Sequence, residues 1–409
     1  MQDRLTFRSH VLSTLGANQA QIEELLNYNQ TVFETGDLIF QCPLSDEPFV
    51  KVWEKYAREV EEAASITVLF QYLVQLGFPV RAGMSQDPDY IAATRRGINP
   101  DTLEAATGLP LRCPERCRLV LHSTPAGRLP LLVPEAREDF VLLVQALTKR
   151  NEPVAIPDSM GASMVAGYNN WHRIRLLRSE FEASHSLPAS WEEELRSLTE
   201  KKPRYQDRFS ILSSGPYSGV SAASLGLEEQ RWQRLSLAIR REHECSHYFT
   251  RRVFGSMRNN LIDELIADYW AIKTALGHFR ADWLLWFFGL EAFPHYREGG
   301  RLQNYRGEPP LSEGSFVILQ CLVKQAAGNL ERFDTRCARE IQHTDPQPAL
   351  FLALSTQTAE EIASEDGANI LSASFLRSRE MIRAKLTFQN QQPGGQRHEE
   401  STAIDEQSG

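Results

Sequence analysis

The residues His243, Glu244 and His247 form the pattern His-Glu-x-x-His, whose residue types and spacing suit metal-dependent chemistry. On a helix, residues four positions apart lie on the same face, so both imidazoles can present a ring nitrogen to one metal ion. Glu244 directly follows the first histidine and can hold a water molecule at that ion. The pattern therefore predicts a metal centre, provided that its surroundings supply the helix and a third ligand.

The surrounding sequence predicts that the motif lies on a helix at residues 227–254. This stretch contains neither glycine nor proline, begins with acidic residues and closes at Gly255 after two arginines, which suits the helix dipole. A turn at 255–260 and a second helix at 261–276 are expected to follow. The apolar stripe of the first helix continues into the two histidines, which places them on its inward face.

Two acidic residues of the second predicted helix, Glu264 and Asp268, have the same four-residue spacing as the histidines. In an antiparallel hairpin, each step back from the turn on one helix is matched by a step forward on the other. Glu264 then comes level with His247, and Asp268 comes level with His243. We expect Glu264 to complete the metal site and Asp268 to orient His243 through its other ring nitrogen.

The motif His243-Glu244-x-x-His247 followed by Glu264-x-x-x-Asp268 resembles the zinc site of the gluzincin metallopeptidases, the thermolysin-like and aminopeptidase-like group. The resemblance covers residues 235–275. It implies that His243, His247 and Glu264 bind one Zn²⁺ ion, that Glu244 is the general base and that Asp268 supports His243. The sequence contains no Gly-Ala-Met-Glu-Asn exopeptidase motif, so aminopeptidase specificity does not follow.

This ligand set also has a chemical rationale of its own. Two neutral imidazoles and one carboxylate leave a zinc ion with a net positive charge and an open fourth position for water. Zinc lowers the pKa of that water, Glu244 accepts its proton, and the resulting hydroxide attacks a polarised carbonyl. Glu244 then returns the proton to the leaving nitrogen.

An oxyanion intermediate also needs a hydrogen-bond donor, and the loop at 295–307 offers several polar groups between glycines. Tyr305 is the first candidate for this catalytic role, followed by Arg301 and His295 as substrate or oxyanion groups. The alternative interpretation is an ordinary surface loop.

A second candidate segment, residues 215–219, lies just before the motif helix and contains Tyr217, a possible substrate or oxyanion group. By resemblance, the strand expected at 209–213 is an edge strand that pairs with the substrate backbone. A plain strand-to-helix turn is the alternative for 215–219.

The composition of the 409-residue chain argues against several functional classes. A net charge of −9 argues weakly against nucleic acid or an anionic membrane surface as a partner, since both usually recruit a basic face. The N-terminus lacks the apolar core of a signal peptide, and the apolar run 283–293 is too short to span a membrane. Six cysteines in so long a chain do not form a disulfide framework. We expect a cytoplasmic protein.

The pattern along the chain predicts an α+β fold with a zincin-like core, a small mixed sheet plus the zinc-binding helix hairpin, and largely helical ends. The expected divisions are a helical region at 1–110, an α+β unit at 111–276, a helical unit at 277–389 and a disordered tail at 390–409. The expected helices and strands are as follows: helices at 18–29, 48–76, 134–147, 190 onward, 283–293, 316–330, 349–362 and 368–386, and strands at 118–122, 129–133, 154–156 and 209–212.

The sequence thus favours a zinc metallopeptidase that acts on a peptide or protein. Two alternatives stay open. The same zinc site can hydrolyse an amide or ester in a small molecule or modified peptide, or a non-enzymatic scaffold can retain zinc for stability.

Overall fold

The computed structural model describes residues 2–33, 43–184, 190–256, 260–342 and 347–390. It is a mixed α/β fold, 62% helical, with a small four-stranded mixed sheet, as the coarse prediction required. The tail predicted to be disordered lies outside the described residues, except for residue 390. No helix among the described residues is long and apolar enough to cross a membrane.

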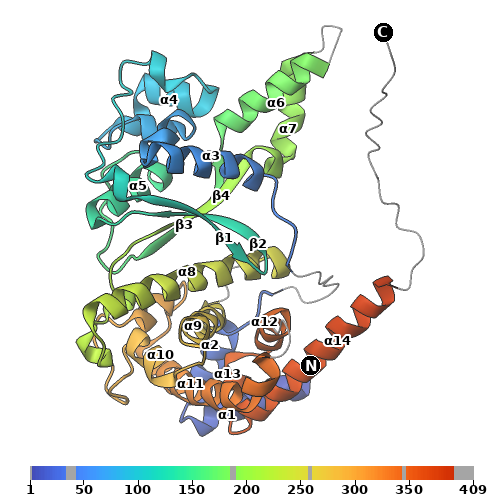
Figure 1. The fold of residues 1–409 in the computed structure, drawn as a ribbon. Helices are drawn as coiled ribbons and strands as arrows, with labels where there is room; N and C mark the ends of the chain where they lie inside the picture. Colours follow the sequence, from blue (N-terminus) through green and yellow to red (C-terminus); the bar gives the residue numbers. More distant parts are fainter. Residues whose placement is uncertain (1, 34–42, 185–189, 257–259, 343–346, 391–409) are drawn as a thin grey trace.

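The sheet has the strand order β1-β2-β4-β3 and separates two groups of helices (Figure 1). Strands β1 and β2 form the predicted hairpin, β2 pairs with β4 in parallel, and β3 pairs with β4 antiparallel. The bounds of the strands are Arg118–Thr124 for β1, Gly127–Val133 for β2, Ala162–Asn169 for β3 and Gln206–Leu212 for β4.

Two predictions about the strands were wrong. Residues 154–156 form no strand, because prolines at 153 and 157 flank them and leave Val154 exposed. The remaining strand is β3, whose sequence does not alternate between polar and apolar residues and which has a bulge at Gly167 (φ 94°). Strand β4 is a central strand paired on both sides, so the edge position expected of 209–213 belongs to β3 instead.

Helices α3 and α5 cover the upper face of the sheet, and α4, α6 and α7 extend from this layer (Figure 1). The helix predicted at 48–76 ends at Ala63, because Ala64 turns left-handed (φ 49°) and Ser65 caps a short 3-10 helix. The helix bounds in this layer are Val50–Ala63 for α3, Pro88–Arg96 for α4, Arg137–Thr148 for α5, Trp171–Ser184 for α6 and Trp191–Glu200 for α7.

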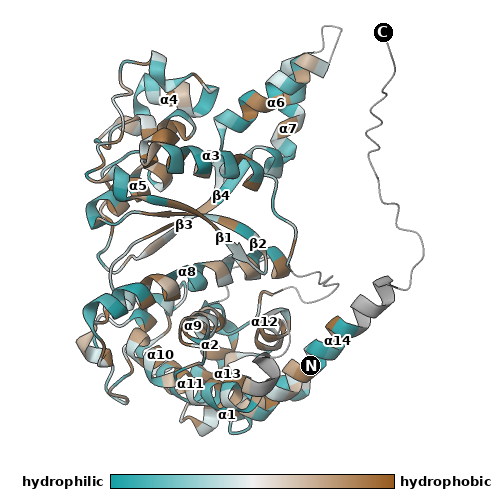
Figure 2. Ribbon diagram, in the orientation of Figure 1, coloured by the Kyte–Doolittle hydropathy of each residue, from teal (hydrophilic) through white to brown (hydrophobic). Residues whose placement is uncertain are grey.

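Helix α8 lies beneath the sheet, and the remaining helices form the layer below it (Figure 1). The middle of the sheet is coloured mostly hydrophobic in Figure 2, consistent with its burial between the two layers. The bounds here are Gln2–Thr14 for α1, Gln19–Tyr28 for α2, Glu229–Phe254 for α8, Asn260–Leu276 for α9, Ala281–Phe288 for α10, Glu313–Gln342 for α11, Gln347–Ser355 for α12, Ala359–Ala363 for α13 and Gly367–Asn390 for α14.

The N-terminal helices α1 and α2 pack against the C-terminal helices, whereas α3 packs on the sheet. The region 1–110 is therefore divided between the two layers. The single helix predicted at 349–362 is two helices, because Thr358 and Glu361 form a capping box that starts α13.

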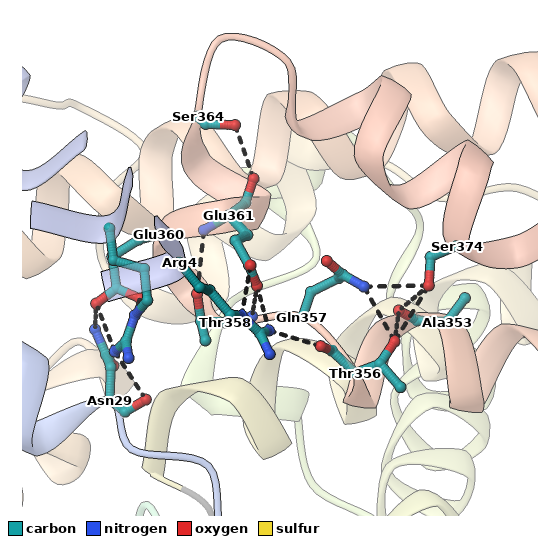
Figure 3. A network of polar contacts seen from close by, with 11 residues as sticks. Arg4, Asn29, Ala353, Thr356, Gln357, Thr358, Glu360, Glu361, Ser364 and Ser374 are labelled. Atoms are coloured by element: carbon teal, nitrogen blue, oxygen red, sulfur yellow. Dashed lines mark hydrogen bonds and ion pairs between the residues drawn. The ribbon is translucent and has the colours of Figure 1, made fainter. Parts of the chain in front are cut away.

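A buried polar network joins α1 and α2 to α13 (Figure 3). Arg8 forms an ion pair with Glu360 at 3.0 Å, and Asn29 donates to the same carboxylate at 2.8 Å. Arg4 pairs with Glu361 beside them. Since the Glu360 side chain is fully buried, its charge depends on these partners.

Substituting Glu360→Ala should lower the free energy of unfolding by about 3–5 kcal/mol, because it leaves the largely buried Arg8 guanidinium without its ion-pair partner. Urea denaturation measures this loss. Glu182→Ala is the matched control, since Glu182 pairs with Arg178 at the surface, and it should cost less than about 1 kcal/mol. Equal effects of the two substitutions would contradict the proposed role of the network.

Candidate metal centre

The motif lies on α8, a 26-residue helix that ends where Gly255 adopts a left-handed conformation (φ 74°). Helix α9 packs along α8 as the second half of a hairpin. The part of the turn at 257–259 lies outside the described residues. This hairpin brings the paired acids and histidines together at the predicted register.

Three side chains converge between the two helices. The Nε2 atoms of His243 and His247 are 3.0 Å apart, and each lies 3.5 Å from a carboxylate oxygen of Glu264. These donor atoms all lie within 4.8 Å of one another. The three residues predicted as ligands therefore form one cluster, with His243 buried and the other two partly buried.

Each histidine also contacts a carboxylate through its other ring nitrogen. Nδ1 of His243 is 2.9 Å from Asp268, the contact that the hairpin register predicted. Nδ1 of His247 is 3.1 Å from Asp263, a residue that the sequence analysis missed. Asp263 precedes Glu264 on a helix that is mostly buried, and a buried acid usually has a partner, so its position was the available signal.

These contacts determine whether the second ring nitrogen of each imidazole, Nε2, carries a proton or a lone pair. An ionised carboxylate only accepts hydrogen bonds, so each Nδ1 donates and each Nε2 presents a lone pair in the neutral ring. Two lone pairs and the Glu264 carboxylate then face one another, and one Glu264 oxygen is buried without a hydrogen-bond donor among the described residues. Such an arrangement requires a positive charge at its centre, either a metal ion or a proton.

The pKa of His247 also shows that the cluster favours a positive charge. Burial alone lowers its pKa, but the negative charges of Asp263, Glu264 and Glu244 outweigh burial and raise the pKa to about 10. In the absence of a metal, the His247 imidazole therefore holds a proton at neutral pH.

The cluster fits a zinc ion in donor type and in spacing. Zinc takes imidazole nitrogen and carboxylate oxygen at about 2.0–2.1 Å, so two donors at a tetrahedral angle lie about 3.3 Å apart. The observed separations of 3.0, 3.5 and 3.5 Å lie around this value. His243, His247 and Glu264 are therefore the residues that would hold the metal.

Tyr217 and Arg301 contact the back of the site. The Tyr217 hydroxyl donates to Asp268 at 2.6 Å and lies 2.9 Å from Nδ1 of His243. Arg301 donates to the Tyr217 hydroxyl at 2.6 Å and forms an ion pair with Asp268. Both side chains lie on the Nδ1 side of His243, opposite the Nε2 atom that faces the cluster. The contacts that the structure shows for them are positioning contacts around Asp268, and the substrate or oxyanion contacts predicted for them stay predictions.

These contacts keep the Asp268 carboxylate ionised. Its burial would raise its pKa, but Arg301, His243 and Tyr217 together lower it below the ordinary value. Burial also raises the pKa of Tyr217 well above its usual range, so the hydroxyl stays protonated and continues to donate to Asp268.

Of the other predicted residues, Tyr305 and Glu244 lie at the cluster, whereas His295 does not contact it. The Tyr305 hydroxyl is within hydrogen-bonding reach of Glu264, and burial raises its pKa well above the ordinary value. Glu244 is half-buried beside His243, and no described residue makes a hydrogen bond to its carboxylate. His295 is exposed and makes no contact with the cluster among the described residues, so its predicted contact with substrate stays a prediction.

The chain belongs to a family of unknown function, DUF7005, whose model matches residues 10–366. The matched region contains the sheet, the α8–α9 hairpin and most of the helices of both layers. Neither the curated proteins nor the solved structures include a match to the chain.

We predict that the purified protein binds about one equivalent of zinc and that His243→Ala reduces this below about a tenth, because two donors hold zinc poorly. Inductively coupled plasma mass spectrometry after dialysis measures the bound metal. His295→Ala, at an exposed position away from the cluster, is the matched control and should retain the zinc. Full zinc content in the His243→Ala protein would contradict this assignment.

The affinity for zinc should rise by about tenfold per pH unit between about pH 6 and pH 9, because zinc must displace the proton held by His247. The raised pKa of His247, about 10, lies above this range, so the imidazole carries a proton throughout it in the absence of zinc. Calorimetry in buffers of different ionisation enthalpy measures the proton released on binding. An affinity that is constant above about pH 7, as an ordinary histidine would give, contradicts the electrostatic description.

Proposed function

We propose that this protein is a zinc-dependent hydrolase, and specifically a metallopeptidase that cleaves an amide bond in a peptide or protein. The observation that carries the proposal is the convergence of His243, His247 and Glu264 beside Glu244, with a carboxylate on Nδ1 of each histidine. The mixed sheet above α8 and the ligand-bearing helix α9 below it also support a zincin-like core.

The charges around the histidines favour a divalent ion over a proton. Four carboxylates, those of Glu244, Asp263, Glu264 and Asp268, contribute to the electrostatics of the two imidazoles or contact them directly. Arg301 offsets one of these charges. A proton would leave the site strongly negative, whereas a dication offsets two charges and occupies the lone pairs of both Nε2 atoms.

When bound, zinc would polarise a substrate carbonyl and lower the pKa of a water molecule. Glu244 lies next to His243, and its carboxylate has no competing hydrogen bond among the described residues. It can therefore accept a proton from the attacking water and deliver it to the leaving nitrogen. The Tyr305 hydroxyl stays protonated and lies within hydrogen-bonding reach of the Glu264 carboxylate. We assign it as the hydrogen-bond donor to the developing oxyanion.

The number of ligands favours catalysis over a structural zinc site. Structural zinc is usually held by four protein ligands, whereas catalytic zinc keeps a position open. Within the described residues, the cluster contains three ligand residues, His243, His247 and Glu264.

A peptide substrate is favoured over a small amide or ester by the position of β3. This strand is an edge of the sheet, and α8 packs against it. An extended peptide can add to such an edge through backbone hydrogen bonds. A non-peptide amide or ester would use the same catalytic residues without this edge.

Glu244→Gln should leave zinc bound and lower turnover by at least about a hundredfold, because it removes the proton acceptor. Tyr305→Phe should also retain zinc and lower kcat by about a hundredfold through loss of an oxyanion donor. Digestion of a peptide mixture, followed by mass spectrometry, measures cleavage by each variant. Unchanged cleavage by zinc-loaded Glu244→Gln protein would overturn the proposed mechanism.

A further inference from the structure

A second polar site lies one helical turn from the candidate metal centre. It is a cavity of about 550 Å³ between the start of α8, the end of β4 and the segment that leads into β3. Arg240, Arg137, Ser214, Gly161 and Pro216 are among its lining residues.

The cavity is lined by two arginines that make no ion pair with a carboxylate among the described residues. Arg240 is 4% exposed and donates to the backbone carbonyls of Ser213, Gly215 and Pro216. Arg137 donates to the carbonyls of Met160 and Pro157. A guanidinium has about five N–H donors, so both arginines have donors beyond these bonds.

The cavity is also lined by two acidic residues, Glu135 and Asp158, but neither forms an ion pair with the two arginines. Glu135 forms an ion pair with Arg116 at 2.9 Å, and Asp158 is exposed to solvent. Neither makes an ion pair with Arg137 or Arg240 among the described residues. A buried cation without an anionic partner is costly, and a bound anion would offset that cost.

Gly161 provides the space for the buried guanidinium. A Cβ atom at this position would lie 2.5 Å from Nε of Arg240, and the glycine has no unusual backbone conformation that would require it. The absence of a side chain at 161 is therefore a packing requirement of Arg240, whose side chain is held at a fixed place in the cavity wall.

The cavity and the metal centre share two structural elements. Arg240 lies four residues before Glu244 on α8, about 6 Å along the helix axis, which corresponds to about two residues of an extended peptide. Pro216 accepts a hydrogen bond from Arg240, and the next residue, Tyr217, contacts His243. A peptide bound at the metal centre can thus reach the cavity within two residues of the cleaved bond.

We propose that this cavity is a specificity subsite that binds a carboxylate of the peptide substrate through Arg137 and Arg240. The inference deepens the proposed peptidase function and rests on it. The carboxylate comes either from an Asp or Glu side chain or from the C-terminus of the peptide. Its planar pair of oxygens matches the fork of a guanidinium donor.

The test uses the zinc-loaded Glu244→Gln protein, in which turnover is expected to be lost while the cavity is intact. Calorimetry compares three acetylated peptides: Ala-Ala-Glu-Ala-Ala amide, Ala-Ala-Ala-Ala-Ala with a free C-terminus, and the pentaalanine amide, which has no carboxylate. At least one of the carboxylate peptides should bind about tenfold more tightly than the neutral amide. The one that does identifies the source of the carboxylate.

Adding Arg137→Gln should abolish this difference, whereas Arg137→Lys should retain part of it. Arg137 is the better position for substitution because it is less buried than Arg240, and circular dichroism verifies that the variants fold. Equal affinity for all three peptides, no binding at millimolar concentration, or an unchanged difference in Arg137→Gln would each overturn the subsite. Because binding is read without turnover, selective binding by a protein that cleaves no peptide would reject the peptidase function and keep the anion site.

Discussion

The structure depends on the meeting of three proton acceptors in one small, poorly hydrated space. The Nε2 atoms of His243 and His247 and the carboxylate of Glu264 face one another within hydrogen-bonding distances, although none of them supplies a proton in its neutral or ionised form. Asp268 and Asp263 enforce this state by occupying the Nδ1 atoms. The surrounding contacts are best understood as means of holding this arrangement in place until a cation occupies it.

Residues far away in the sequence contribute to that support. Arg301 and Tyr217 approach Asp268 from two different loops and fix the orientation of His243. Tyr28, on the N-terminal helix α2, donates to the Tyr305 carbonyl and accepts from Asn260 at the start of α9. The N-terminal helices therefore brace both the ligand-bearing helix and the loop of Tyr305, and the Glu360 network joins them to the C-terminal layer. This gives the first helices of the chain a connection to the site.

Local, periodic features of the site could be predicted from the sequence, whereas loop-dependent ones could not. The register that pairs His247 with Glu264 and His243 with Asp268 follows from helix geometry and a short turn. The loop 295–307 has no such periodicity, so residue type alone could not separate Tyr305, which reaches Glu264, from His295, which is exposed. Strand β3 was missed because the bulge at Gly167 disrupts the alternation that identifies strands.

The central claim is that one zinc ion is held by two imidazoles and one carboxylate with a position left open. X-ray absorption spectroscopy at the zinc edge of the loaded protein tests it most directly. The account predicts about four nitrogen and oxygen donors at about 2.0–2.1 Å, with the multiple-scattering signal of two imidazoles and no sulfur. A sulfur shell at about 2.3 Å, or a shell without imidazole scattering, would contradict it.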